Sequence, residues 1–248
     1  MLRNDLAAYL DEFLDVAAFR DYCPNGLQVE GRDHVGVIVT GVTASADLLD
    51  AAVAAGADAI LVHHGYFWKG EDPRITGMRR RRIATLLNHG INLYAYHLPL
   101  DAHPDIGNNA MLARRLDIRA EGRFGEQDLG VYGVLDGPLP LRDFAARIAD
   151  RLHREPLTIG DDERAVRRVA WCTGAAQGYF EQAAALGVDA YITGEASEQT
   201  FHIARESGVA FVGAGHHATE RYGIEALGAH LETRFGLQHR YIDISNPV

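Results

Sequence analysis

The sequence has little cysteine. Cys23 and Cys172 are the only two among 248 residues, and they form no Cys-x-x-Cys arrangement. A disulfide framework or a thiolate zinc site needs more cysteines at closer spacing. We therefore expect two reduced thiols in a cytoplasmic protein, and a metal site here would use histidine and carboxylate side chains.

Long apolar runs are also missing, so no segment of the sequence is predicted to span a bilayer. Residues 2–16 carry four acidic side chains among their apolar ones and have no basic stretch before a continuous apolar region. This pattern is typical of an amphipathic helix and not of a signal peptide. We expect no membrane partner.

An excess of positive charge is the third absence. Lysine and arginine number 24 against 34 acidic residues, which gives a formal net charge of −10. This balance argues against broad attraction to nucleic acid, and an anionic substrate would need bound cations to offset the charge. No glycine-rich loop of the P-loop or dinucleotide-binding kind occurs either.

Alternating strands and helices are what the sequence does contain. Short apolar runs suited to buried strands recur between helical segments, and this rhythm indicates an α/β fold with mainly parallel sheets. Ser45 is expected to cap the helix that follows it. The expected strands are residues 35–42, 58–62, 91–96, 166–173, 188–193 and 209–214, with a closing strand at 241–244.

The two halves of the chain resemble each other. A helix, a Gly-x-Asp-Ala turn and a buried strand occur at residues 51–61 and again at 182–192. This match predicts duplicated βα units. We expect a first half at residues 1–121, a short intervening segment at 122–162, and a second half at 163–248 that repeats the first.

Histidines and carboxylates gather where these strands end. One strand is followed by His63 and His64, and two others are followed by His97-x-x-x-Asp101 and His216-x-x-x-Glu220. The carboxyl ends of parallel strands are where sites form in such sheets. We therefore predict metal ligands at five of these residues, namely His63, His64, Asp101, His216 and Glu220.

Five ligands exceed what one tetrahedral ion with an open position needs, so two divalent ions per subunit is the economical number. Imidazole and carboxylate ligands fit Fe, Zn, Mn, Co or Ni without choosing among them. His216 and Glu220 would share one face of a helix that begins there. Pro99 is expected to make the turn before Asp101 irregular.

Other polar residues have two interpretations each. His97 could be a ligand or a supporting residue, and Glu195 could be a helix first-turn acid or an acid/base near the metals, so both are candidate catalytic residues. The basic run at residues 79–82 is more typical of a solvated helix face than of a phosphate site. The aromatic run at residues 66–68 is more typical of packing or subunit contact than of a base-stacking platform.

At this point the chain resembles the NIF-three-like family of dinuclear-metal proteins, often described as GTP cyclohydrolase I type-two homologues. The resemblance covers nearly the whole chain, and its His-His-Gly and Gly-His-His-x-Thr-Glu motifs are specific. The matching segments are residues 24–31, 40–45, 62–70, 97–101, 193–195 and 215–220.

This resemblance implies a NIF-three-like fold, a ring-shaped homohexamer, and metal ligands at the same five residues. It also implies a metal-dependent hydrolase that acts on a nucleotide or a related phosphorylated compound. The alternative is a non-catalytic ring protein that binds metal or a partner. An open coordination position would distinguish the first from the second.

Overall fold

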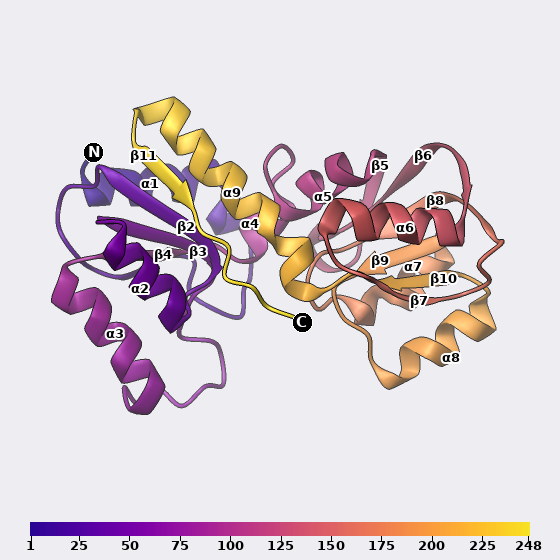
Figure 1. Ribbon diagram of the computed structural model, residues 1–248, viewed down its shortest axis with the longest axis horizontal. Helices are drawn as coiled ribbons and strands as arrows, with labels where there is room; N and C mark the ends of the chain where they lie inside the picture. Colours follow the sequence, from indigo (N-terminus) through magenta and orange to yellow (C-terminus); the bar gives the residue numbers. More distant parts are fainter. The chain divides into compact units, whose positions relative to one another are not determined.

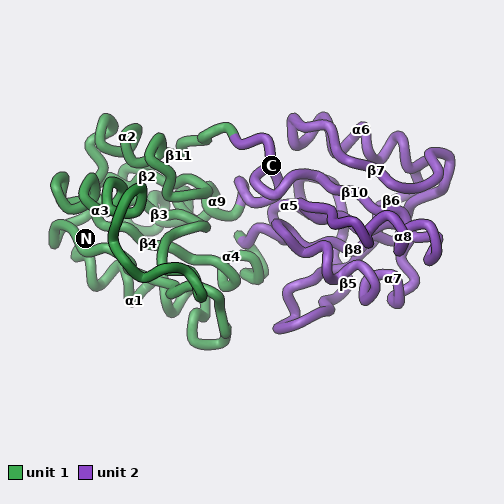
Figure 2. The backbone as a smooth tube through the Cα atoms, turned by 90° about the horizontal axis from the view of Figure 1, so that it is seen from below, with its two compact units in different colours: residues 1–106, 223–245 green, residues 107–222, 246–248 purple.

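The computed structural model describes all 248 residues as an α/β protein with two sheets. The chain forms two compact units, which Figure 2 shows in different colours. Unit 1 comprises Met1–Ile106 and Gly223–Ser245, and unit 2 comprises Gly107–Tyr222 and Asn246–Val248. No helix is long and apolar enough to cross a membrane.

Unit 1 is built on a five-stranded sheet (Figure 1). Its strands, in spatial order, are β1 (Gly26–Val29), β4 (Asn92–Ala95), β3 (Ala59–His64), β2 (Val37–Thr43) and β11 (Gln238–Tyr241). The last four are mutually parallel, and β1 pairs with β4 in the antiparallel direction. The sheet is therefore mainly parallel, as the sequence predicts.

Both faces of this sheet are buried, which is why its strands read as continuous apolar runs. Ile60 and Val62 pack with α2 (Ala46–Ala54) and α3 (Gly77–His89), whereas Leu61 packs on the opposite face with α1 (Arg3–Phe13) and the unit 1 part of α9 (His216–Phe235). Ser45 caps α2 as expected, since its hydroxyl accepts a hydrogen bond from the Leu48 amide at 3.3 Å.

Unit 2 contains a six-stranded mixed sheet. Its spatial order is β5 (Ile118–Phe124), β6 (Gly130–Pro140), β8 (Ala165–Trp171), β9 (Ala190–Thr193), β10 (Ala210–Gly213) and β7 (Leu157–Ile159). Only β8, β9 and β10 are parallel. Helices α5 (Asn108–Leu116) and α6 (Leu141–Leu152) pack on one face, and α7 (Phe180–Ala185) and α8 (Glu198–Ser207) accompany the other.

Four short helices remain. One of them, α4 (Leu98–Ala102), follows β4, and three 3-10 helices span Val16–Ala18, Glu126–Asp128 and Gln177–Tyr179.

The two sheets share one arrangement of four strands. In each unit three of the parallel strands lie next to one another, and an antiparallel edge strand pairs with the outermost of them: the order is β1-β4-β3-β2 in unit 1 and β7-β10-β9-β8 in unit 2.

The repeated Gly-x-Asp-Ala turn has a structural explanation. One carboxylate oxygen of Asp58 accepts hydrogen bonds from the Gly36 and Val37 amides at 2.8 and 2.9 Å. The equivalent oxygen of Asp189 accepts from the Arg167 and Arg168 amides at 2.9 and 2.8 Å. Each aspartate thus ties the start of one parallel strand to the start of its neighbour.

Several boundaries differ from the sequence expectations. The compact units divide the chain at residues 106 and 107, and residues 122–162 supply β6, α6 and β7 to unit 2 and do not form a separate segment. The closing strand is Gln238–Tyr241 and not residues 241–244. It lies at the sheet edge with alternate residues exposed, so no apolar run marks its position.

We expect both aspartates to stabilise the fold, and Asp58 also pairs with Arg32 at 2.7 Å. Asp58→Ala and Asp189→Ala each remove an acceptor that serves two backbone amides, so each should lower the free energy of unfolding by about 1–3 kcal/mol. Asp50→Ala, at an exposed position on α2, is the control and should change it by less than about 0.5 kcal/mol. Urea unfolding measures all three, and a loss no larger than that of the control would contradict this role.

Candidate metal centre

In unit 1, two histidines end a buried parallel strand. His63 and His64 are the last residues of β3, and their ring centroids lie 4.6 Å apart. His63 is fully buried, and Nδ1 of His64 lies 3.3 Å from the Thr43 hydroxyl on the neighbouring strand. Adjacent residues of a strand ordinarily point to opposite sides, yet these two rings lie together at the strand end.

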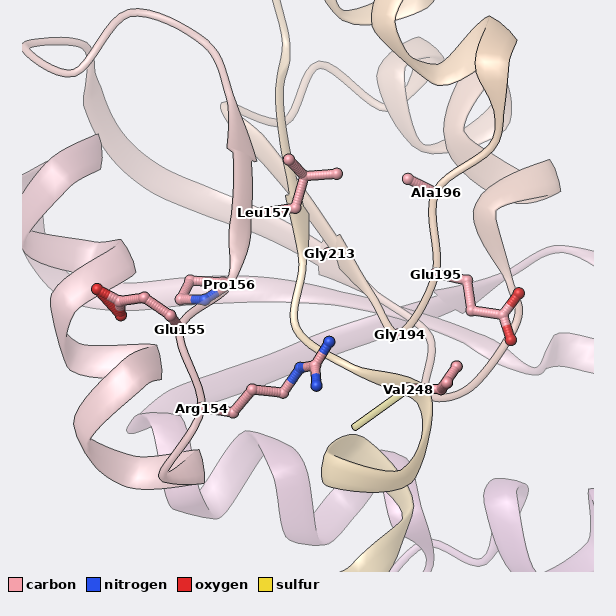
Figure 3. A pocket seen from close by; sticks show the side chains of 9 residues that line it. All are labelled: Arg154, Glu155, Pro156, Leu157, Gly194, Glu195, Ala196, Gly213 and Val248. Carbon is pink, nitrogen blue, oxygen red and sulfur yellow. The ribbon is translucent and has the colours of Figure 1, made fainter. Parts of the chain in front are cut away.

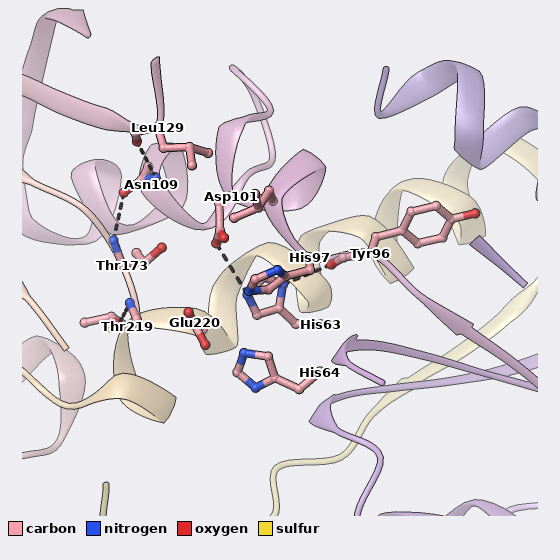
Figure 4. A network of polar contacts seen from close by, with 12 residues as sticks. His63, His64, Tyr96, His97, Asp101, Asn109, Leu129, Thr173, Thr219 and Glu220 are labelled. Carbon is pink, nitrogen blue, oxygen red and sulfur yellow. Dashed lines mark hydrogen bonds and ion pairs between the residues drawn. The ribbon is translucent and has the colours of Figure 1, made fainter. Parts of the chain in front are cut away.

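The backbone fixes which nitrogen of His63 is available. Nδ1 lies 2.9 Å from the Tyr96 carbonyl oxygen, which only accepts hydrogen bonds, so Nδ1 carries the proton (Figure 4). Nε2 is therefore the nitrogen left for a further partner, and it lies 3.5 Å from a carboxylate oxygen of Asp101. An imidazole nitrogen and a carboxylate oxygen this close together are a donor pair of the kind that divalent metals bind.

Asp101 reaches this position from a helix, which corrects the expectation of an irregular turn. It lies in α4, and its amide donates to the His97 carbonyl at 3.1 Å. Pro99 sits in the first helical turn, where its missing amide hydrogen has no intrahelical acceptor to lose. Residues 98–101 are therefore helical and His97 is the N-cap residue before them, whereas His216 is the first residue of α9.

His97 is held by its own carboxylate. Its Nδ1 lies 2.7 Å from Asp21, which also accepts hydrogen bonds from the Leu98 amide and the Asn25 side chain at 2.9 Å. Burial opposes ionisation of Asp21, but the hydrogen bonds outweigh it and lower its pKa to about 2. The ring centroid of His97 lies 5.0 Å from that of His63, so the two imidazoles share one pocket of unit 1.

Cys23 lies beside this group, with its sulfur within 4.8 Å of ligand atoms of Asp21 and His97. Burial and the neighbouring Asp21 charge raise the pKa of its thiol to about 12. A metal ligand must be the thiolate, which this environment disfavours. Both cysteines are free and buried, as expected.

In unit 2, His216 stands between two carboxylates at the start of α9. Its Nδ1 lies 2.6 Å from Glu195, and its Nε2 lies 3.1 Å from Glu220 one helical turn later. Burial disfavours the charged ring, yet both carboxylates favour it and raise the pKa of His216 to about 9. Glu195 orients the ring in the way that carboxylates orient metal-binding histidines.

The carboxylate of Glu220 fits closely against bare backbone. Its side chain is almost fully buried, and a methyl group added at Gly174 would clash with its Oε1 and come within 3.2 Å of His216 Nε2. The Gly174 amide in turn donates to the Thr219 hydroxyl at 3.1 Å (Figure 4). Gly174 also adopts a φ of +69°, so glycine is required there for two reasons.

Each unit thus offers imidazole and carboxylate donors of the type that divalent transition metals accept. His63, His64 and His97 alone could hold an ion, because one nitrogen of each lies within 4.8 Å of the others. The structure supports the presence of candidate metal sites.

The supporting residues were not identified from the sequence. Asp21, Asn25 and Thr43 contact ligand candidates through ordinary polar side chains, and the Tyr96 contact is made by a backbone carbonyl. Gly174 carried a signal, because Thr173-Gly174 repeats Thr40-Gly41, but the repeat did not reveal its contact with Glu220.

The aromatic and basic runs have packing roles in unit 1. Trp68 lies edge-on to His97 with 5.0 Å between ring centroids, and the Tyr66 hydroxyl donates to the Ala44 carbonyl at 2.9 Å. Arg79 pairs with Glu71, whereas Arg80 and Arg81 lie on the outer part of α3. These placements agree with the packing and solvated-face interpretations.

The fold and the site together define a class of protein: an α/β protein with clusters of histidine and carboxylate side chains at its strand ends. The family Duf34/NIF3 (NGG1p interacting factor 3) matches residues 1–247, and the chain belongs to this family.

Close relatives share the whole length of the chain. It is 58% identical over 248 residues to a protein of Pseudomonas aeruginosa, with 99% of this chain and 98% of the relative covered. It is 55% identical over 249 residues to a protein of Escherichia coli K12, with 100% of both covered. Both relatives are named GTP cyclohydrolase 1 type 2 homolog.

Two solved structures are similar throughout. The structure of protein ybgI, described as of unknown function, is 55% identical with a TM-score of 0.97, and a protein from Thermus thermophilus, TTHA1606, is 36% identical with a TM-score of 0.88. In both comparisons 100% of each chain is covered.

Substituting Gly174 tests the Glu220 geometry. Gly174→Ala should displace the Glu220 carboxylate and weaken metal binding by about tenfold or more, measured by calorimetric titration of the metal-free protein. Gly187→Ala is the matched control, because Gly187 has the same φ of +69° but no atom within 4 Å of an added methyl group. Equal metal affinity in the two variants would show that the contact with Glu220 is unimportant for binding.

Proposed function

We propose that the protein is a dinuclear metal-binding hydrolase that acts on a nucleotide or a related phosphorylated compound. The observation that carries this proposal is the closeness of two metal-ligand types in unit 1, where His63 Nε2 lies 3.5 Å from a carboxylate oxygen of Asp101 and its other nitrogen is held by the Tyr96 carbonyl. A second ligand pair, His216 and Glu220, is available in unit 2. The relatives named GTP cyclohydrolase 1 type 2 homolog support a nucleotide as the substrate class.

In this proposal the ligands are His63, His64 and Asp101 of unit 1 and His216 and Glu220 of unit 2. Divalent ions held by such residues lower the pKa of water towards neutrality and so supply a nucleophile for hydrolysis. They also offset the charge of a phosphorylated substrate on a chain whose own net charge is −10.

The remaining residues of the site would position groups and carry protons. Glu195 keeps His216 Nδ1 occupied, so Nε2 is the nitrogen left for a ligand role. Asp21 does the same for His97, which leaves His97 Nε2 to exchange a proton with the substrate or its leaving group. His97 and Glu195 are therefore the candidates for acid and base work.

We assign the bridging role to Glu220 and a single ion to Asp101. The helical turn before Asp101 is regular, so irregularity there does not distinguish the two residues. What does distinguish them is length and surroundings. Glutamate has one more methylene than aspartate, and Glu220 lies in the cradle beside Gly174 with little room to move away.

The second candidate function is a non-catalytic metal-binding or partner-binding protein. Under this alternative the ions order the assembly and their coordination shells are closed by protein atoms. The family resemblance supports a homohexameric ring in either case, and the exposed Phe67 beside buried Tyr66 offers apolar surface for subunit contact.

Replacing each acidic ligand separates their roles. Glu220→Gln should lower the affinity for each of the two metal ions by about tenfold or more, because the variant loses the negative charge that offsets the repulsion between two neighbouring cations. Asp101→Asn should empty mainly one site. Elemental analysis after dialysis measures both, and a Glu220→Gln protein that keeps two tight ions while Asp101→Asn loses both would reverse the assignment.

A screen of the metal-reconstituted protein tests the activity. We expect hydrolysis of a nucleotide or phosphoester that disappears on chelation, returns with added metal, and falls at least about 100-fold in Glu220→Gln. Turnover that survives chelation would contradict the metal-dependent mechanism. Absence of turnover on every nucleotide and phosphoester tested, with metal bound, would favour the non-catalytic alternative.

The oligomeric state has its own measurement. Light scattering at micromolar concentration should give a mass about six times the 27.2 kDa of one chain. A monomeric mass under these conditions would contradict the ring.

A further inference from the structure

A cavity in unit 2 is not used by the ligands above. Its volume is about 640 Å³, and it lies where the parallel strands β9 and β10 end (Figure 3). Gly194 and Gly213 form part of its wall at these strand ends, and the start of β7 lies opposite. The carboxyl ends of parallel strands are the usual place for a small ligand in an α/β sheet.

The cation of this cavity is Arg154, which has no carboxylate partner. Its guanidinium projects into the cavity, whereas the neighbouring Glu155 carboxylate points away from it (Figure 3). The side chain lies against Gly215, at the entry to α9, where any added methyl group would clash with it. Nε of Arg154 is buried and has no hydrogen-bond acceptor.

Residues 246–248 are called the tail segment here. Main-chain oxygens of this segment accept the hydrogen bonds that groups beside the cavity donate. Arg154 Nη1 donates to the Pro247 carbonyl, and the His217 amide in the first turn of α9 donates to the Val248 oxygen at 3.0 Å. The Arg154 guanidinium is bonded to the neutral Pro247 carbonyl and forms no ion pair with a carboxylate. An oxyanion would form a stronger, charge-assisted bond to this guanidinium.

We propose that this cavity is an oxyanion subsite, in which Arg154 and the His217 amide bind the phosphate or carboxylate group of a small ligand after the tail segment moves aside. A phosphate fits best, because two guanidinium nitrogens and one amide can each meet a different oxygen. Glu195 lines the same cavity and contacts His216, so a ligand held by Arg154 would extend towards the candidate metal ligands of unit 2.

This inference rests on the proposed function in one respect, since it assigns the charged end of the phosphorylated substrate to a particular subsite. Phosphate binding at Arg154 does not itself require a metal ion. The two proposals can therefore fail separately: metal content tests the centre, and the dependence of phosphate affinity on Arg154 tests the subsite.

Calorimetric titration with inorganic phosphate tests the subsite in metal-loaded protein. A chain that ends at Ser245 lacks the competing carbonyls, so it should bind phosphate about tenfold more tightly than the full chain. Arg154→Gln in that shortened chain should lose this gain. Arg167→Gln, which removes an exposed arginine on β8, is the matched control and should keep it. Acetate in place of phosphate shows whether a carboxylate is accepted equally.

Equal phosphate affinity in the full and shortened chains, or an affinity that does not change with Arg154→Gln, would overturn the proposal. If phosphate binds at the metal ions instead, its affinity will not change with Arg154→Gln. The full chain provides a test without any variant: saturating phosphate should speed amide hydrogen exchange of Asn246 and Val248, the two residues of the tail segment that carry an amide hydrogen. Phosphate binding with unchanged exchange would contradict displacement of the tail segment.

Discussion

A buried histidine nitrogen that faces a carboxylate needs a proton or a cation between them, and this requirement governs the candidate centre. In unit 1 the Tyr96 carbonyl keeps a proton on Nδ1 of His63, so Nε2 is the nitrogen that meets Asp101. In unit 2 both nitrogens of His216 meet carboxylates, and the ring in the metal-free chain holds an extra proton with a pKa of about 9. Both arrangements favour a cation, and divalent metals are the cations that imidazole and carboxylate jointly bind.

The scaffold brings these groups to strand ends in the same way in each unit. Asp58 and Asp189 fix the starts of neighbouring parallel strands, so the strands also end in register. Histidine follows the end of β4 and of β10, and a helix begins directly afterwards with a carboxylate four residues on. Two copies of one supersecondary unit therefore present related ligands, and differences in detail, such as Gly174 beside Glu220, make the copies unequal.

The sequence predicts the parts of this arrangement that depend on local pattern. Strands such as β2 and β3 were identified because burial on both faces makes them uninterrupted apolar runs, and the five ligand candidates were identified because they follow such runs. The strand β11 was placed three residues too late, since it is an exposed edge strand whose pairing with β2 is set by contacts distant in sequence. The sequence predicts an irregular turn at Pro99, because a first-turn position cannot be told from an interior one until the helix start is known. The supporting contact of His63 comes from a backbone carbonyl, which no residue type reveals.

The central claim is that these side chains hold two metal ions in each chain. Its most direct test is elemental analysis of the full-length protein after saturation with a divalent metal and removal of the unbound excess, with protein concentration determined independently. The account predicts close to two ions per chain. One ion or none at saturation would contradict it.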